Sequence, residues 1–268
     1  FKIWAIAEGG YFLNWLWHSP QHILTSSQLH LQFQASSADN TITLNPTQSV
    51  VVSLLNTLRK ATYHVFLDNL FSSPNLFRVL REQGFAATGT LRLNSGVHCN
   101  LVELKTLDRK GRLLWHWNQL LRLPTADHLV MQFAWKDSKL MLMASTNYNG
   151  LELVQAIRHR PSTEDRQNRP LRAAFGDDPE LIVAIPEFAV DYNNYMNSVD
   201  RGDQLRSYDS WSHRSRRGGW SAIAWGYLLE VIVINTYLLQ LRGQSDLPKR
   251  LTVLKKWRSK LSTALIST

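Results

Sequence analysis

Apolar and polar residues along the first ninety positions follow the patterns of short strands and amphipathic helices. Apolar runs bounded by turn residues such as Gly9-Gly10 predict strands, and apolar residues spaced three and four apart predict helices. Ser72-Ser73-Pro74 is typical of a helix start and Gly84 of a helix end. The predicted elements are strands at 2–7, 11–17 and 29–34, a helix at 46–60, a strand at 63–67, a helix at 74–83 and a strand at 85–91.

The pattern changes after residue 93 and predicts mostly strands, before helices return near the end of the chain. Pro186 is typical of a helix start, and Glu187 places a negative charge in the first turn, where the helix dipole favours it. The predicted elements are strands at 113–121, 128–135, 139–145 and 181–185, a loop at 159–170, a helix from Pro186 that carries Asp200 and Asp203, and helices at 220–241 and 248–266.

This order of elements predicts an α/β fold. Two antiparallel strands before parallel crossovers are the order of the ribonuclease-H-like fold. We therefore expect a ribonuclease-H-like mixed sheet, interrupted by a mainly β insertion and followed by a helical C-terminal segment. The predicted parts are the first part of the core at 1–93, the insertion at 94–180, the core completion at 181–207 and the helical segment at 208–268.

The composition restricts the partners and the compartment. The net charge of +9 favours a polyanionic partner, with nucleic acid first and an anionic membrane surface second. Cys99 is the single cysteine, so a disulfide framework or a cysteine-rich zinc site cannot form within the chain. The most apolar stretch, 228–241, is interrupted by polar residues, so no membrane span is expected. Because the chain begins at Phe1, directly in a strand-like run, we expect a fragment of a longer protein.

Four acidic residues are candidates for a metal site. Glu8 and Asp68 each end a predicted strand, and Asp200 and Asp203 lie three apart on a predicted helix. In a ribonuclease-H-like sheet these strands are neighbours and the late helix packs beside them, so the four carboxylates would converge. Such oxygen ligands suit two Mg²⁺ or Mn²⁺ ions, which can cut a phosphodiester. By spacing alone, a turn or cap role for Asp68 and a solvated face for the pair stay open.

The strings around these aspartates resemble the motifs of one family. Asp68 opens DNLFSSP at 68–74, TGTLR follows at 88–92, and YNNYMNSVDRGDQ spans 192–204. These strings are similar, in order and distance, to the catalytic motifs of piggyBac-type transposases. Tyr208, Trp220 and the Asn235-Thr236-Tyr237 string also stand where the family has such residues.

The resemblance implies a metal-dependent enzyme that acts on DNA. It implies Mg²⁺-dependent nicking and strand transfer at transposon ends, with insertion at TTAA, catalysed by Asp68, Asp200, Asp203 and Glu8. It also implies a nuclear protein, a homodimer, and a helical segment at 208–268 that binds DNA and dimerises.

Two departures from the family pattern support an alternative. Glu8 stands where the family has its first catalytic aspartate, and Asn197-Ser198 stands where it has two glycines. A carboxylate displaced by about 1 Å can lower a rate about a hundredfold. The alternative is a catalytically impaired or domesticated copy that binds DNA or a partner. A ribonuclease-H-like enzyme acting on RNA hybrids fits the fold but not the strings.

Basic and aromatic residues supply further candidates for DNA contact. Arginines follow the late aspartates and are predicted to bind DNA phosphates, with a solvated turn as the alternative: Arg206, Arg214, Arg216 and Arg217. The basic residues of the last helix are as consistent with a solvated face as with DNA. Trp115, Trp117 and Trp135 are interpreted as β core rather than as surfaces for bases.

Overall fold

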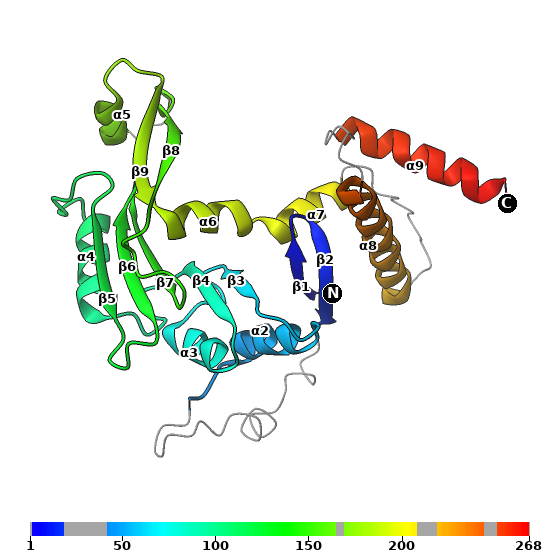
Figure 1. Cartoon of the computed structure of the whole chain (residues 1–268), viewed down its shortest axis with the longest axis horizontal. Coiled ribbons are helices and arrows are strands. Elements are labelled where there is room, and N and C mark those ends of the chain that lie inside the picture. Colours follow the sequence, from blue (N-terminus) through cyan, green and yellow to red (C-terminus); the bar gives the residue numbers. More distant parts are fainter. Residues whose placement is uncertain (1, 19–41, 165–168, 208–218, 244–250, 268) are drawn as a thin grey trace. The chain divides into compact units, whose positions relative to one another are not determined.

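The computed structural model describes residues 2–18, 42–164, 169–207, 219–243 and 251–267, which form a mixed α/β structure (Figure 1). The chain divides into two compact units. The smaller unit joins Phe1–Pro20 to Asn197–Thr268, and the larger unit is Gln21–Met196. The strand predicted at 29–34 lies outside the described residues, as do Arg214, Arg216 and Arg217.

A two-stranded hairpin and helices form the smaller unit. Strand β1 (Ile3–Glu8) pairs antiparallel with β2 (Tyr11–Trp17), as the apolar runs predicted. The buried Phe12 anchors β2, because the Asn235 amide accepts from its N–H at 2.9 Å and donates to its carbonyl at 2.8 Å. This pair of bonds satisfies both backbone groups of Phe12 and fixes the hairpin to a helix. The helices are α7 (Ser198–Ser207), α8 (Trp220–Gly243) and α9 (Leu251–Ile266).

A five-stranded sheet is the centre of the larger unit. Its strand order is β3-β4-β7-β6-β5, and β3 and β4 are parallel while all the other pairs are antiparallel. Three helices are α2 (Pro46–Asn56), α3 (Pro74–Glu82) and α4 (Cys99–Arg109). The strands are β3 (His64–Leu67), β4 (Ala86–Thr90), β5 (Leu120–Pro124), β6 (Met131–Lys136) and β7 (Leu140–Ser145).

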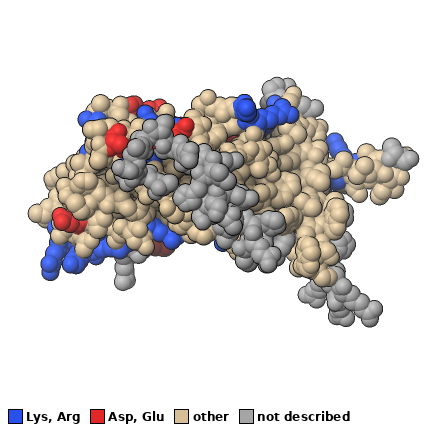
Figure 2. Space-filling model, turned by 90° about the horizontal axis from the view of Figure 1, so that it is seen from below, with Lys and Arg blue, Asp and Glu red and all other residues tan. Residues whose placement is uncertain are grey.

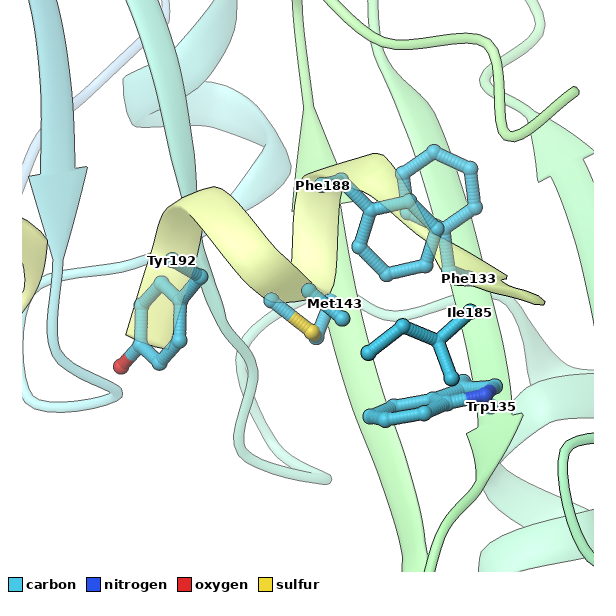
Figure 3. Packing of buried hydrophobic residues seen from close by; sticks show 7 residues of the cluster. Phe133, Trp135, Met143, Ile185, Phe188 and Tyr192 are labelled. Atoms are coloured by element: carbon cyan, nitrogen blue, oxygen red, sulfur yellow. The ribbon is translucent and has the colours of Figure 1, made fainter. Parts of the chain in front are cut away.

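A long two-stranded ribbon completes the larger unit and leads into a helix that covers the sheet. The ribbon pairs β8 (Leu153–His159) with β9 (Glu180–Pro186), with α5 (Arg169–Phe175) between them in the chain. Helix α6 (Glu187–Tyr195) follows directly and buries Phe188 against Phe133 of β6, with the rings stacked 4.2 Å apart between centroids (Figure 3). Buried residues of β6, β7, β9 and α6 thus form one apolar cluster.

The mixed α/β class is confirmed, while the ribonuclease-H-like detail is not. Strand β1 pairs with β2 in one sheet and β3 pairs with β4 in another, and these sheets belong to different units, so the predicted position of β1 beside β3 stays a prediction. Strands β5 to β7, predicted as an insertion, extend the same sheet as β3 and β4. The boundaries predicted at residues 93, 180 and 207 stay predictions.

Three elements differ locally from the prediction. The helix expected from Pro186 to Asp203 is two helices, because the chain leaves α6 at Met196 and the Asn197 carbonyl starts α7 by accepting from the Arg201 N–H at 2.9 Å. The strand expected at 113–121 begins only at Leu120, as β5, because Asn118 takes a positive φ of 67° that a strand does not allow. Helix α4 was not predicted, because it lies in the region interpreted as mainly β.

Helix α8 is the one described helix that is long and apolar enough to cross a membrane by length and composition. One such helix is weak evidence, since the core helix of a soluble protein passes the same test. The buried residues Val231 and Ile234 and the ion-paired Glu230 lie within it. The expectation of no membrane partner stays a prediction.

Candidate active site

Asp68 lies where parallel strand β3 ends, in the turn before helix α3. Its carboxylate accepts from the Asn69 N–H at 2.6 Å, and its carbonyl accepts from the N–H groups of Phe71 and Ser72 at 3.1 and 3.2 Å. The side chain is exposed. The turn therefore fixes the backbone of Asp68 at the carboxyl end of a strand, where open α/β sheets bind ligands.

The strings around Asp68 interlock, which explains their residue types. Gly89 of β4 passes so close to the turn that an added Cβ would meet Ser72 Oγ and would lie 2.5 Å from the Leu67 carbonyl oxygen. Only glycine fits there without moving the backbone. Arg92 donates to the Asn69 side chain at 2.8 Å. Glycine and arginine of TGTLR thus hold the DNLFSSP turn from the neighbouring strand.

The next turn of the DNLFSSP string begins helix α3. The Ser73 hydroxyl accepts from the Leu76 N–H at 3.1 Å, as an N-cap residue does, and it also accepts from the Gln48 side chain at 2.8 Å. Pro74 occupies the first helical position, as predicted. The turn that carries Asp68 is therefore fixed at both ends.

Tyr192 brings helix α6 to the same end of the sheet. Its hydroxyl is hydrogen-bonded to Thr90 Oγ1 at 3.2 Å, and its side chain is buried. Burial raises the pKa of the Tyr192 phenol, the Thr90 hydrogen bond lowers it, and the negative charge of Asp68 raises it. Tyr195, one turn along, stacks on Phe66 of β3 with 5.0 Å between ring centroids. Both tyrosines of the YNNYM string therefore hold α6 beside the Asp68 strand.

Glu8, at the end of β1 in the smaller unit, is paired with an arginine. The Arg242 guanidinium lies 3.4 Å from the Glu8 carboxylate and donates to the Glu8 carbonyl at 3.0 Å. It also lies over the Tyr11 ring at 5.4 Å. Both charged side chains are about half exposed or more, so water screens this pair and its contribution to stability is small.

Helix α7 packs its first turns against the hairpin and carries Asp200 and Asp203. Ser198 Oγ accepts from the Gly9 N–H at 3.2 Å. A Cβ on Gly202 would lie 2.7 Å from the Gly10 carbonyl oxygen, so the VDRGDQ string needs glycine for close packing. Asp200 is exposed in the first turn of α7, where its charge suits the helix dipole.

Asp203 is engaged by Arg206 one turn later. The Arg206 guanidinium bonds Asp203 at 3.0 Å and Glu230 of α8 at 2.6 Å, and it lies over the Tyr227 ring at 4.6 Å. The arginine predicted to contact DNA thus joins α7 to α8 within the smaller unit. Its contact with DNA stays a prediction.

The four predicted carboxylates are divided between the units. Glu8, Asp200 and Asp203 belong to the smaller unit, and Asp68 belongs to the larger one. Among the described residues, no three His, Cys, Asp or Glu side chains form a group that could hold a metal ion. Carboxylate oxygens suit Mg²⁺ or Mn²⁺ chemically, but two of the four are already paired with arginines.

Sequence reasoning missed several residues of the site. Arg242 and Glu230 gave no signal, because their partners lie more than twenty residues away or at the other end of the chain. Helix α4, by contrast, had a signal in the sequence that was overlooked. Leu101, Leu104 and Leu107 are spaced three apart, as in a helix, and Gly111 follows with a positive φ of 66°.

Comparisons with known proteins match most of the chain. A family model described as Transposase IS4 matches residues 3–237. The human PiggyBac transposable element-derived protein 2 is 23% identical over 243 residues, which cover 89% of this chain and 35% of that protein. A cryo-EM structure of a piggyBac transposase synaptic complex with hairpin DNA has a similar fold, with a TM-score of 0.56 and 14% identity. That likeness covers 92% of this chain and 42% of the matched chain, so the chain spans less than half of either relative.

Proposed function

The chain belongs to the transposase IS4 family and is of the piggyBac type, and on that premise we propose that it is the catalytic core of a DNA transposase. The proposed reaction is metal-dependent nicking and strand transfer at transposon ends. One observation carries the proposal. The DNLFSSP and TGTLR strings are interlocked by Gly89 and by the Arg92–Asn69 bond, so that the exposed Asp68 stands on a rigid turn at the carboxyl end of β3. A catalytic carboxylate needs such fixed geometry.

The metal ligands in this proposal are the four carboxylates. Asp68 and Asp200 are exposed, and no ion pair of theirs is formed among the described residues. Glu8 and Asp203 would supply further oxygens after leaving their arginines. A divalent ion bound there would activate a water or a 3′-hydroxyl and stabilise the leaving oxygen of a phosphodiester.

The proposed partners are DNA and a second copy of the chain, and the proposed compartment is the nucleus. The solved relative is a transposase in complex with hairpin DNA, and the basic charge of this chain suits the same polymer.

Helix α8 exposes large apolar residues that suit a dimer interface: Trp225, Leu229, Ile232 and Leu239. If this surface is the dimer interface, we expect Ile232→Glu to convert the dimer into a monomer, as measured by sedimentation. A molar mass that is unchanged by Ile232→Glu would contradict this interface.

The ion pair of Glu8 favours a second candidate, a protein that binds DNA but no longer cuts it. Glutamate replaces the aspartate of the family at this position, and its carboxylate pairs with Arg242. The curated human relative is itself described as transposable element-derived. In this reading the substitution at position 8 removed the activity.

Cleavage of DNA bearing matched terminal repeats, with and without Mg²⁺ or Mn²⁺, separates the two candidates. A transposase cuts in a metal-dependent manner, and Asp68→Ala abolishes the cut. Cleavage that survives Asp68→Ala means that the site is wrongly assigned. If the protein binds DNA but is inactive, and Glu8→Asp restores cleavage, the second candidate holds and the lesion is at position 8.

A further inference from the structure

A basic cavity lies beside the Asp68 turn in the larger unit. It measures about 480 Å³ and is lined by Asn69, residues 90–94, Lys105 and Arg109 of α4, and residues 140–142 of β7. The cavity has the size of a site for a small molecule or a nucleotide. It lies next to Asp68 in the chain and in space, because Asn69 both follows Asp68 and lines the wall.

The lining combines cationic side chains with an apolar floor. Arg92, Lys105 and Arg109 contribute positive charge, and the lining contains no acidic residue. Leu91, Leu140 and Leu142 are almost fully buried, so the apolar surface that a ligand can reach is that of Leu93 and Met141. A phosphate at the cationic side chains and a sugar or base against Leu93 and Met141 would match both parts of this surface.

The three cations differ in how firmly the structure holds them. Arg92 is bonded to Asn69, and Lys105 donates to the Leu140 carbonyl and lies 3.9 Å from Asp108. Burial lowers the pKa of Lys105, and the charge of Asp108 opposes that change. Arg109 is exposed at the end of α4 and forms no side-chain hydrogen bond or ion pair within the described part of the chain.

Basic side chains also surround this end of the larger unit. Lys136 lies close to Lys105, because both approach the Asp108 carboxylate, at 2.5 and 3.9 Å. The positive charges of Arg109, Lys136 and Lys139 lower the pKa of Lys105. Lysine and arginine side chains gather at the lower left of the face seen in Figure 2, with a few acidic side chains at the same end. The charge around the cavity therefore favours a polyanion over an isolated neutral ligand.

We propose that this cavity is a subsite for one nucleotide of a DNA strand, whose phosphate binds Arg109 beside the Asp68 turn. The inference rests on the proposed function, since it takes DNA as the substrate. A strand that follows the cavity wall from Arg109 to Asn69 would bring its backbone to Asp68. The subsite would thus position the strand for cutting without touching the reacting atoms.

The salt dependence of DNA binding tests the subsite. Binding of a fluorescein-labelled single-stranded oligonucleotide is measured by anisotropy over a range of salt concentrations. Arg109→Gln weakens binding and lowers the slope of log affinity against log salt by about 0.7, the value for one phosphate contact on a single strand. Arg112→Gln removes the same charge three residues away, outside the cavity, and leaves the slope unchanged.

A variant that is expected to bind DNA more tightly tests the subsite independently, because misfolding cannot explain a gain in affinity. Met141 lines the cavity and is 37% exposed, so Met141→Lys adds a cation there without opening the core. We expect tighter binding and a slope steeper by about 0.7. Inorganic phosphate at matched ionic strength is the competitor. If it displaces DNA from the wild type as well as DNA itself does, the site takes a small anion and the assignment to a strand is wrong.

The proposed function and the nucleotide subsite predict different results in these binding measurements. If the wild type binds no DNA, the proposed function and the subsite both fail. If the wild type binds DNA and Arg109→Gln behaves like Arg112→Gln, the subsite alone is overturned, because general charge then accounts for binding.

Discussion

Gly202 of α7 packs closely against the hairpin of β1 and β2. An added Cβ would lie 2.6 Å from Phe12 Cε2 and 2.7 Å from the Gly10 carbonyl oxygen. Alanine favours a helix over glycine by about 1 kcal/mol, but overpacking of this kind costs about 1–3 kcal/mol. We therefore expect Gly202→Ala to lower the free energy of unfolding, measured by urea denaturation.

Gly226 of α8 provides the matched control for that substitution. It is also a helical glycine, and an added Cβ would meet no heavy atom within 4 Å outside its own helix. Gly226→Ala should raise the free energy of unfolding by up to about 1 kcal/mol. Equal effects at the two positions would show that α7 does not pack against the hairpin as described.

His64 makes the stability of the larger unit depend on pH. Its ring bonds Thr88 at 2.8 Å, and burial lowers the pKa of His64 while the charge of Asp191 opposes that change. The unfolded chain therefore takes up a proton at higher pH than the folded chain. The contribution of His64 to the free energy of unfolding is fully present above the ordinary histidine pKa of about 6.5. It is lost as the pH falls from there toward the pKa of His64 in the folded protein.

Urea denaturation at about pH 7.5 and about pH 5.5 measures this loss, since the two values lie on either side of the ordinary pKa. Glutamine keeps a hydrogen-bonding group but does not titrate, so His64→Gln should reduce the difference between the two free energies. His128→Asn removes an exposed histidine and should leave the difference as in the wild type. An undiminished difference in His64→Gln would assign the pH dependence to other groups.

At the scale of elements, an arginine bridge joins α7 to α8. Arg206 bonds Asp203 and Glu230, and the side chains of Arg206 and Glu230 are only 21% and 18% exposed. Removing Arg206 leaves the Glu230 carboxylate shielded from water and unpaired, and removing Glu230 leaves Arg206 with the more exposed Asp203 alone, so each change destabilises the protein. We expect Arg206→Gln and Glu230→Gln each to lower the free energy of unfolding.

A double-mutant cycle on these two residues distinguishes a structural bridge from a DNA clamp. Because the pair is in direct contact, the double variant should lose less than the sum of the single variants, with a coupling of about 1 kcal/mol. A coupling near zero, together with weakened DNA binding in Arg206→Gln alone, would favour the clamp that the sequence predicted.

Local elements were predictable from sequence because their signals are local, whereas pairing partners were not. Ser73, Pro74 and Gly84 lie at the ends of α3, where they were expected, since capping depends on neighbouring residues. The break between α6 and α7 was missed because Asn197-Ser198 is a weak signal within a helical pattern. The side-by-side arrangement of β1 and β3 was inferred from fold order and stays a prediction, because the two strands belong to different units.

At the scale of the whole molecule, the aspartates were predicted as site residues from the strings around them and not from their spacing. DNLFSSP, TGTLR and VDRGDQ are explained by contacts of Gly89, Arg92 and Gly202 within each unit. The engagement of Glu8 by Arg242 had no local signal, because the two residues are 234 positions apart. The site role of the carboxylates thus stays a prediction from their strings, and no signal in the sequence indicated the arginines that pair with two of them.

Because the carboxylates are divided between two units, metal binding tests whether residues of both units contribute to one metal site. If Asp68 and the three carboxylates of the smaller unit share an ion, Mn²⁺ must stabilise the folded state of both units together. An ion at ten times its Kd contributes about 1.4 kcal/mol, which raises the Tm of a chain of this size by about 3 °C.

The decisive variants remove one carboxylate from each unit. Asp68→Asn and Asp200→Asn should each abolish the rise in Tm that Mn²⁺ causes, because each removes a ligand from the shared ion. Asp177→Asn, an exposed aspartate of the larger unit, should retain the rise. If Asp68→Asn retains it and Asp200→Asn does not, the ion binds within the smaller unit alone. Asp68 would then have no part in the metal site, and the proposed catalytic cluster would be wrong at the residue where its strings are strongest.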